Sequence, residues 1–172
     1  MTLPRLCLVL GGARSGKSRH AEALVGRLPP PWAYIATAQA FDDEMRARIA
    51  EHRARRDQRW RTTEAPLDLP GALRDAGDLP VLVDCLTLWL GNLLLSEHDV
   101  TRAEAALGAA LDARTAPTVL VSNEVGLGIV PDNALARRFR DHAGRLHQSL
   151  AARADHVALV VAGLPLAVKG SA

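Results

Sequence analysis

Eight consecutive residues near the start of the chain, GGARSGKS at 11–18, have the types and spacing of a loop that binds phosphate. They match the pattern G-x-x-x-x-G-K-[ST] at every defined position. Its glycines let backbone N–H groups converge on phosphate oxygens. Lys17 can reach the β- and γ-phosphates of a nucleotide, and the Ser18 hydroxyl can ligate Mg²⁺. The predicted nucleotide contacts are Gly11, Gly12, Ala13, Arg14, Ser15, Gly16, Lys17 and Ser18.

The residues on either side of this loop give it the expected context. An apolar run at 6–10 is typical of a strand buried on both faces. After Ser18, apolar residues recur at helical spacing (Ala21, Leu24, Val25, Leu28) until three prolines at 29–31. A chance Gly/Ser loop with an exposed lysine is the alternative, and the strand and helix argue against it.

Asp84 ends a second apolar run, at 81–84. A carboxylate at the end of such a strand can hold a metal ion together with Ser18, on the opposite side of a bound nucleotide's phosphates. The alternative is an ordinary aspartate that caps the following helix. Given the phosphate loop, we favour an Mg²⁺ site formed by Ser18 and Asp84.

The stretch at 46–61, RARIAEHRARRDQRWR, contains seven arginines and one histidine. In a helix predicted at 43–56, His52 shares a stripe with Met45 and Ile49, and arginines at 48, 55 and 56 surround it. Nearby positive charge keeps an imidazole neutral, which makes His52 a possible nucleophile toward a nucleoside triphosphate. Two alternatives stay open, because arginine runs commonly form solvated faces or nucleic-acid patches and most helical histidines are structural.

Composition restricts the classes of protein that fit. The 172 residues suit one domain spanning 1–172, and the net charge of +2 does not favour nucleic acid or membrane surfaces. Cys7 and Cys85 lack metal-ligand spacing and are expected to be buried thiols in a reducing compartment. No stretch approaches membrane-spanning length, and the first strand begins too early for a signal peptide, so we expect a cytoplasmic protein.

Strand-like runs and helical patterns alternate along the chain. Further strands are predicted at 32–37, 118–121 and 157–161, and helices at 86–95, 101–114 and 133–153. The helix at 101–114 is expected to begin with a capping box formed by Thr101 and Glu104. The region 66–80 has the composition of a linker. Alternation of this kind predicts an α/β domain with a mostly parallel sheet, helices on both faces and ligands at the carboxyl ends of the strands.

Several segments, in order, resemble the bifunctional adenosylcobinamide kinase / adenosylcobinamide-phosphate guanylyltransferase family of cobalamin biosynthesis. They are GGARSGKSRHAE (11–22), YIATA (34–38), FDDEMRARIAEHRARR (41–56), WRTTE (60–64), VLVDCLT (81–87) and VSNEVGLGIVPDNALARRFRD (121–141). The resemblance implies a RecA-like P-loop NTPase fold, a homotrimer, Mg²⁺, and ATP and GTP as substrates. It also implies phosphorylation of adenosylcobinamide, followed by transfer of GMP from GTP to the resulting phosphate through a guanylyl-histidine.

The same resemblance assigns roles to individual residues. The family's nucleophilic histidine falls on His52, and Glu64 is a residue whose carboxylate can accept hydrogen bonds from guanine, although it can also be a surface residue that begins a loop. The implied GTP site comprises Ala36, Thr37, Ala38, His52, Arg53, Ala54, Arg55, Glu64 and Asp84. The roles of Asn123 and Glu124 stay open between metal or substrate contact and fixing the next loop. His147 departs from the family pattern, which has asparagine there.

Two other functions remain as alternatives. One is a P-loop kinase of small molecules in which His52 is inert and the arginines only cover phosphates. The other is a nucleotide-dependent nucleic-acid-binding or assembly protein, against which the near-neutral charge and the scarcity of aromatic residues count. A regulatory GTPase is disfavoured because the sequence has no N-K-x-D motif for guanine.

Overall fold

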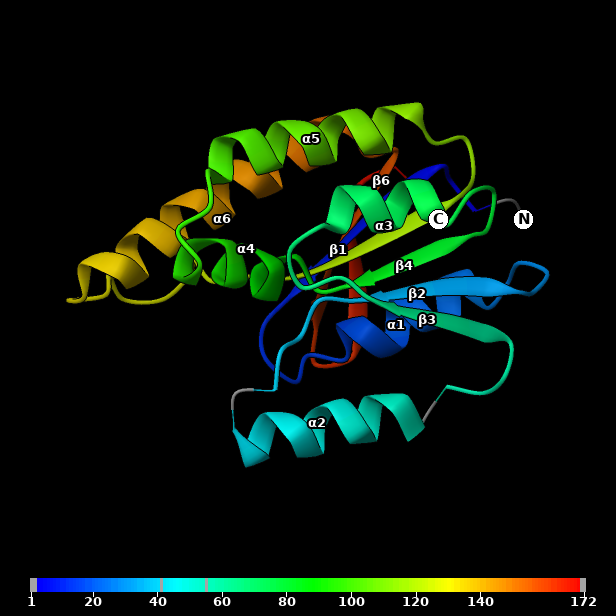
Figure 1. Cartoon of the computed structure of the whole chain (residues 1–172), viewed down its shortest axis with the longest axis horizontal. Coiled ribbons are helices and arrows are strands. Elements are labelled where there is room, and N and C mark those ends of the chain that lie inside the picture. Colours follow the sequence, from blue (N-terminus) through cyan, green and yellow to red (C-terminus); the bar gives the residue numbers. More distant parts are fainter. Residues whose placement is uncertain (1–2, 41, 55, 171–172) are drawn as a thin grey trace.

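The computed structural model describes residues 3–40, 42–54 and 56–170. Strands and helices alternate along most of this length (Figure 1). The elements are β1 (Leu6–Gly11), α1 (Lys17–Val25), β2 (Trp32–Ala36), α2 (Asp43–Ala54), β3 (Trp60–Glu64), α3 (Leu69–Asp75), β4 (Val81–Asp84), α4 (Leu86–Leu95), α5 (Val100–Ala113), β5 (Thr118–Asn123), α6 (Ala134–Arg153), β6 (His156–Val161) and β7 (Leu164–Lys169).

All seven strands form one sheet in the order β3-β2-β4-β5-β1-β6-β7. Strands β1 to β6 are parallel to their neighbours, and β7 alone runs antiparallel, to β6. Because β5 lies between β1 and β4, the residues that end these three strands meet at one edge of the sheet: Gly11 is opposite Asn123, and Asp84 is opposite Val121. The predicted phosphate loop and Asp84 therefore lie on the same edge.

Helices cover both faces of the sheet, as the sequence predicted. Figure 1 shows α3, α4, α5 and α6 on one face and α1 on the other, with α2 beyond the end of the sheet formed by β2 and β3. Alternate residues of β1 divide between two apolar clusters: Leu6 and Leu8 pack with the four helices, and Cys7 and Val9 pack with α1. The sheet is therefore buried on both faces at its centre, which explains the continuous apolar runs of its strands.

The predicted strands near 6–10, 32–37, 81–84, 118–121 and 157–161 are confirmed as β1, β2, β4, β5 and β6, and both cysteines are free and buried. Burial raises the pKa of the Cys7 thiol to about 12, so it stays protonated.

Three elements were not predicted. Strands β3 and β7 lie at the two edges of the sheet and are largely exposed, so they lack the apolar pattern of the central strands.

The third missed element is α3, which lies within the region read as a linker. Its proline stands in the first turn, where no backbone N–H is needed, and Asp68 caps the helix by accepting a hydrogen bond from the N–H of Gly71 at 2.8 Å.

The predicted capping box at Thr101 is wrong: α5 begins at Val100, and Asp99 caps it by accepting a hydrogen bond from the N–H of Arg102 at 3.0 Å. The residue that caps is the one whose backbone is still extended.

Arg114 connects the end of α3, the loop before β4 and the start of β5 through hydrogen bonds. It follows α5, is only 8% exposed, and donates to the carbonyl oxygens of Leu73 (2.7 Å), Gly77 (2.8 Å) and Leu79 (2.8 Å). Its Nε also donates to Thr118 Oγ1, at 3.1 Å. The guanidinium thus satisfies the carbonyl groups at the end of α3 and in the loop before β4.

We expect Arg114→Met to destabilise the protein by about 3 kcal/mol, because it leaves several buried carbonyl groups without a donor while keeping the bulk of the side chain. The measurement is urea unfolding followed by circular dichroism. Arg102→Met is the matched control, since Arg102 lies exposed on α5, and it should change the free energy of unfolding by less than about 0.5 kcal/mol. Equal stability of the two variants would contradict the role given to Arg114.

Candidate active site

The phosphate loop leaves the end of β1 and is held by the turn between β6 and β7. The N–H of Gly163 in this turn donates to the carbonyl of Ser15 at 2.8 Å. A Cβ on Gly11 would lie 2.7 Å from the carbonyl oxygen of Val160, so no larger residue fits there. Gly16 has a φ of 94°, which other residues rarely adopt. Two of the loop's glycines are therefore required by its shape.

Lys17 begins α1 and is 9% exposed. Its Nζ donates to the carbonyl of Gly12 at 3.1 Å, which folds the side chain back over the loop. The first turn of α1 contains no acidic residue, so the positive end of the helix dipole and the ammonium group act on the same space. That combination attracts the phosphate groups of a nucleotide.

Asp84 lies at the end of β4 and accepts a hydrogen bond from the hydroxyl of Tyr34, with 3.0 Å between Oη and Oδ2. Tyr34 is buried in β2, the neighbouring strand. Burial raises the pKa of Tyr34 far above its ordinary value, and the negative charge of Asp84 raises it further. The tyrosine therefore stays protonated and donates to the carboxylate at any working pH.

Thr37 connects the ends of β2 and β4. Its hydroxyl donates to the carbonyl of Cys85 at 2.7 Å and accepts from the N–H of Cys85 at 2.8 Å, and its side chain is fully buried. Asn92 on α4 donates to the carbonyl of Thr37 at 2.8 Å. Both functions of the Thr37 hydroxyl are thus used to hold the backbone beside Asp84, and the predicted place of Thr37 in the GTP site stays a prediction.

A cleft of about 1600 Å³ opens above this edge of the sheet. It brings together the phosphate loop, the ends of β2 and β4, and α2. Predicted site residues that line it are Arg14, Ser15, Gly16, Lys17, Ser18, Ala36, Ala38, Arg53, Glu64 and Asp84. Predicted residues of the described chain outside its lining are Gly11, Gly12, Ala13, Thr37 and Ala54. Most of the site predicted from the sequence thus surrounds one cavity.

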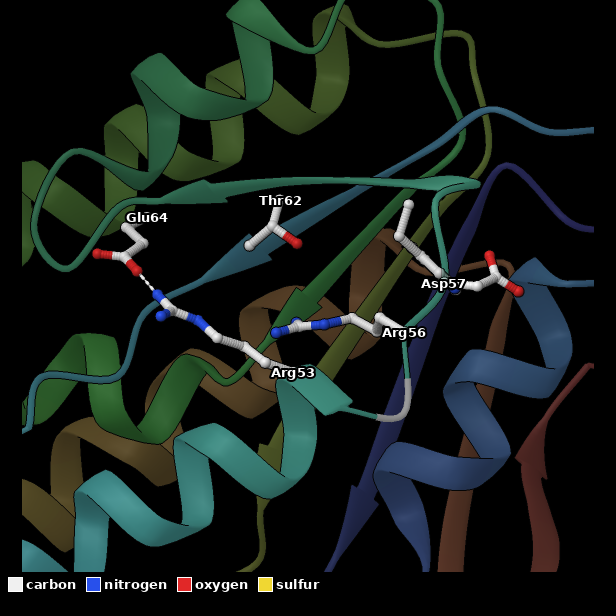
Figure 2. A pocket seen from close by; sticks show the side chains of 6 residues that line it. Arg53, Arg56, Asp57, Thr62 and Glu64 are labelled. Carbon is white, nitrogen blue, oxygen red and sulfur yellow. Dashed lines mark ion pairs between the residues drawn. The ribbon is translucent and has the colours of Figure 1, made fainter.

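Arg53 near the end of α2 forms an ion pair with Glu64 at the end of β3 (Figure 2). In Figure 2 the side chain of Arg53 points toward Glu64 on β3, whereas Asp57 points away from it. These residues also line a smaller pocket of about 390 Å³, with Thr62. Both members of the Arg53–Glu64 pair are more than half exposed, so the pair contributes only about 0–1 kcal/mol and a ligand can replace either partner.

His52 belongs to α2, between Glu51 and Arg53, which both line the cleft. The side chains of Met45, Arg48 and His52, and the whole of Arg55, lie outside the described residues, so the predicted stripe and the charges around the imidazole stay predictions.

One further histidine bears on the chemistry, because His20 on α1 also lines the cleft. Burial lowers the pKa of His20, and the positive charges of Arg27 and His156 lower it further, which keeps this imidazole neutral near pH 7.

The oxygen donors in the cleft fit Mg²⁺. Ser18 and Asp84 offer one hydroxyl and one carboxylate, and magnesium is commonly bound by one or two protein oxygens plus phosphates and water. Within the described chain no group of three or more His, Cys, Asp or Glu side chains gathers as a metal site. The donor set therefore suits an ion that arrives with a nucleotide rather than one enclosed by protein ligands.

Asn123, Glu124 and His147, whose roles the sequence left open, have distinct surroundings. Asn123 lines the cleft and its amide donates to Thr87 Oγ1 at 2.9 Å, whereas the Glu124 carboxylate accepts from the N–H of Gly126 and so fixes the following loop. His147 is buried on α6, with Nε2 2.8 Å from Ser122 Oγ, and does not line the cleft. Burial lowers the pKa of His147. This departure from the family pattern is a packing feature away from the cleft.

The structure also brings Tyr34, to which sequence reasoning gave no role, into the lining of the cleft, where it contacts Arg56, one of the arginines predicted to surround His52. A signal for Tyr34 existed in the strand period. Tyr34 and Ala36 are two residues apart and so share a face of the sheet, and Ala36 is opposite Asp84. The pairing of β2 with β4 was needed to use it, and no pattern in the sequence supplied that pairing.

Comparison with known proteins decides the family. The family model described as cobinamide kinase / cobinamide phosphate guanyltransferase matches residues 7–168. The chain belongs to this family. It is 53% identical to the bifunctional adenosylcobalamin biosynthesis protein CobP of Pseudomonas aeruginosa over 168 residues, covering 95% of this chain and 96% of the relative. It is 48% identical to the bifunctional adenosylcobalamin biosynthesis protein CobU of Salmonella typhimurium, covering 95% and 99%.

Solved structures place this member of the cobinamide kinase / cobinamide phosphate guanyltransferase family in the P-loop NTPase fold. A protein of Pyrococcus horikoshii OT3 superposes with a TM-score of 0.57 at 11% identity, covering 100% of this chain and 89% of its own. An ATPase of the type III secretion system of pathogenic bacteria gives a TM-score of 0.55 at 14% identity, covering 95% and 56%. At these identities the likeness concerns the fold alone. The predicted RecA-like fold class is confirmed.

We expect Lys17→Ala to weaken binding of ATP and GTP by about 10- to 100-fold, the effect of losing one charge-assisted contact with phosphate. Titration with a fluorescent nucleotide analogue measures it. The chain has one other lysine, Lys169, whose Nζ donates to the carbonyls of Ala151 and Ala152 at the end of α6. Lys169→Ala should leave nucleotide affinity unchanged, and equal losses in both variants would argue against the phosphate loop as the binding site.

Proposed function

We propose that the protein catalyses two successive reactions of cobalamin biosynthesis in the large cleft. In the first, a nucleoside triphosphate (ATP or GTP) phosphorylates the aminopropanol hydroxyl of adenosylcobinamide. In the second, GMP is transferred from GTP to that phosphate, giving adenosylcobinamide-GDP and pyrophosphate. The observation that carries this proposal is the family match over residues 7–168 together with bifunctional relatives about half identical to the chain.

The lining of the cleft supports a site for both reactions. The phosphate loop on one side supports the kinase step, and residues of α2, among them Arg53, line the cleft as well. His52 belongs to the same helix, and its role in the guanylyl transfer is part of the proposal. A cavity of about 1600 Å³ exceeds the space that a nucleotide alone requires, since ordinary small-molecule sites occupy about 300–1,000 Å³. That excess supports a second, larger substrate beside the nucleotide.

In the kinase step, the oxygen of the substrate hydroxyl attacks the γ-phosphorus, the bond from the γ-phosphorus to the bridging oxygen breaks, the nucleoside diphosphate leaves, and the hydroxyl proton is released to water. Lys17 and the N-terminus of α1 stabilise the negative charge that spreads over the transferring group. Ser18 and Asp84 would hold Mg²⁺, which when bound neutralises phosphate charge and aligns the phosphates. No protein nucleophile is needed for this step.

In the guanylyl transfer, a ring nitrogen of His52 attacks the α-phosphorus of GTP and pyrophosphate leaves. A phosphate oxygen of the phosphorylated corrinoid then attacks the same phosphorus, the P–N bond breaks, and the imidazole is regenerated. Arg53, which lines the cleft, is proposed to bind the polyphosphate, and Arg55 is proposed for the same role on the family pattern.

Selection of GTP is proposed to involve Glu64. Its carboxylate lies where β3 ends at the cleft and can accept hydrogen bonds from guanine N1–H and the exocyclic amine, which adenine does not offer together. Glu64 is paired with Arg53, and because this exposed pair is weak, guanine can displace Arg53 and release its guanidinium toward phosphate. Binding of guanine to Glu64 would then be coupled to binding of phosphate by Arg53.

A kinase of small molecules that lacks the guanylyl transfer is the alternative. It shares the phosphate loop, Lys17 and Asp84 with the proposal, so those residues do not separate the two functions. The covalent guanylyl group does, because a plain kinase forms none.

We therefore expect His52 to carry the guanylyl group. Incubation with [α-³²P]GTP and Mg²⁺ should label the protein, and the label should be stable in base and lost in mild acid, as expected for a phosphoramidate. His52→Asn should abolish the label and the guanylyl transfer yet keep phosphorylating adenosylcobinamide. Peptide mapping of the labelled protein identifies the residue.

His20→Asn is the matched control, since His20 is a second histidine of the cleft that burial and nearby positive charges keep neutral near pH 7. It should keep the label. If His20→Asn lost the label and His52→Asn kept it, the nucleophile would lie on α1. If the wild-type protein phosphorylated adenosylcobinamide but was never labelled, the plain kinase would be the correct function.

We also propose a cytoplasmic homotrimer. Its support is the family resemblance together with large apolar side chains exposed on the single chain, including Leu127 (85%), Ile129 (97%), Leu164 (73%) and Leu166 (61%). No helix of the described residues has the length and apolar character to cross a bilayer. Light scattering after gel filtration should give a mass three times the 18.4 kDa of the chain, and a mass of one chain over a range of concentrations would contradict the trimer.

A further inference from the structure

We propose that Tyr34 is a positioning residue with two separate effects in the cleft: its hydroxyl orients Asp84 toward the metal, and its ring holds Arg56 in place to bind nucleotide phosphate. The inference rests on the proposed function only in assuming that the cleft takes a nucleoside triphosphate with a divalent cation. It concerns neither the corrinoid nor the covalent intermediate.

The first effect follows from the register of β2 and β4. Tyr34 is opposite Leu82 and Ala36 is opposite Asp84, so Tyr34 and Asp84 are diagonal neighbours on the same face of the sheet. The 3.0 Å hydrogen bond from Oη to Oδ2 crosses this diagonal, and Tyr34 is only 3% exposed. A buried donor in a fixed strand restricts rotation of the carboxylate, as outer partners of metal ligands commonly do.

The second effect concerns the face of the tyrosine ring. The guanidinium carbon of Arg56 lies 3.6 Å from the ring centroid of Tyr34, within the range of a cation–π contact. Trp60 packs edge-on against the same ring, with the centroids 5.9 Å apart. The ring is thereby held between an arginine and a tryptophan, both from the chain that follows α2.

Arg56 is arranged as an anion-binding group. It lines the large cleft, and its Nη1 is buried without a hydrogen-bond partner among the residues that the structure describes. An aromatic ring, in contrast to a carboxylate, holds a guanidinium without neutralising its charge or using its N–H groups. Those groups are suited to the polyphosphate of a nucleoside triphosphate, with which arginine forms charge-assisted hydrogen bonds.

These contacts make one side chain responsible for two measurable quantities. The hydroxyl acts through Asp84 and should affect metal affinity, whereas the ring acts through Arg56 and should affect nucleotide affinity in the absence of metal. Tyr34→Phe removes only the hydroxyl, and Tyr34→Leu removes the ring as well. The two substitutions therefore separate the two effects, and neither measurement requires turnover of a corrinoid.

For the hydroxyl, we expect Tyr34→Phe to weaken Mn²⁺ binding to the protein–ADP complex about tenfold, as measured by electron paramagnetic resonance. The effect should disappear in an Asp84→Asn background, because Tyr34 then has no carboxylate to orient. Ser122→Ala is the matched control. Ser122 lies on β5, outside the lining of the cleft, and its buried hydroxyl is hydrogen-bonded to the side chain of His147 on α6, so the substitution should leave Mn²⁺ affinity unchanged. Unaltered Mn²⁺ binding in Tyr34→Phe, or the same loss with and without Asp84, would overturn this half.

For the ring, GTP binding is measured by calorimetry in the presence of EDTA. Tyr34→Phe should bind as the wild type does, and Tyr34→Leu and Arg56→Gln should each bind about tenfold more weakly, with no further loss when combined. Arg56→Gln tests the arginine even where Tyr34→Leu proves too unstable to purify. Wild-type affinity for metal-free GTP in Arg56→Gln would overturn this half. Failure of the proposed corrinoid chemistry would leave both measurements intact.

Discussion

The carbonyl of Ser15 and the N–H of Gly163 form the hydrogen bond on which the geometry of the phosphate loop depends. It connects the loop after β1 to the turn between β6 and β7, two segments almost 150 residues apart in the chain. The close approach of Val160 to Gly11 adds a second contact from the same hairpin. A loop that would otherwise be fixed only by β1 and α1 is thus held from a third side, which preorganises its N–H groups for phosphate. The antiparallel β7 contributes to the site in this way, because the turn that joins it to β6 makes the contact with the phosphate loop.

The central elements of the fold could be predicted from the sequence, and the edges could not. Strands β1, β4 and β5 are buried on both faces, so each is a continuous apolar run that stands out from its surroundings. Strand β3 is paired on one side only and β7 is exposed along its whole length, so selection for burial leaves little trace in either. Helix α3 was missed because it begins with Asp68 and Pro70, residue types that are common in loops. Here Asp68 caps the helix and Pro70 stands in its first turn. Local composition therefore predicted the strands whose residues are nearly all buried. It failed for the exposed edge strands and for α3, whose capping residues resemble those of a loop.

The same distinction applies to the candidate site. Lys17, Ser18 and Asp84 were predicted from short motifs and strand ends, which are signals local in sequence, and all three line the same cleft. Tyr34 was not predicted as a cleft residue, and Arg56 was predicted only as one of the arginines around His52, because their contact with each other and the bond to Asp84 depend on how β2, β4 and the segment after α2 lie together. Thr37 was predicted in the GTP site from the resemblance, and the structure adds that its hydroxyl joins the ends of two strands. A motif identifies which residues a site requires, whereas the division between residues that touch the ligand and residues that hold them is decided by strand order.

Strand order also bears on the proposal that one cleft serves two phosphorus centres. With β5 between β1 and β4, the phosphate loop and Asp84 stand apart by the width of a strand, enough for phosphates and a metal ion between them. Strand β2 lies on the far side of β4, so its Tyr34 reaches Asp84 in one direction and Arg56 in the other. The segment that follows α2 is thereby connected to the carboxylate of Asp84 through a single ring and hydroxyl. A γ-phosphorus bound at the phosphate loop and an α-phosphorus bound near α2 would then share one set of charges, so that the cleft need not be duplicated for the second reaction.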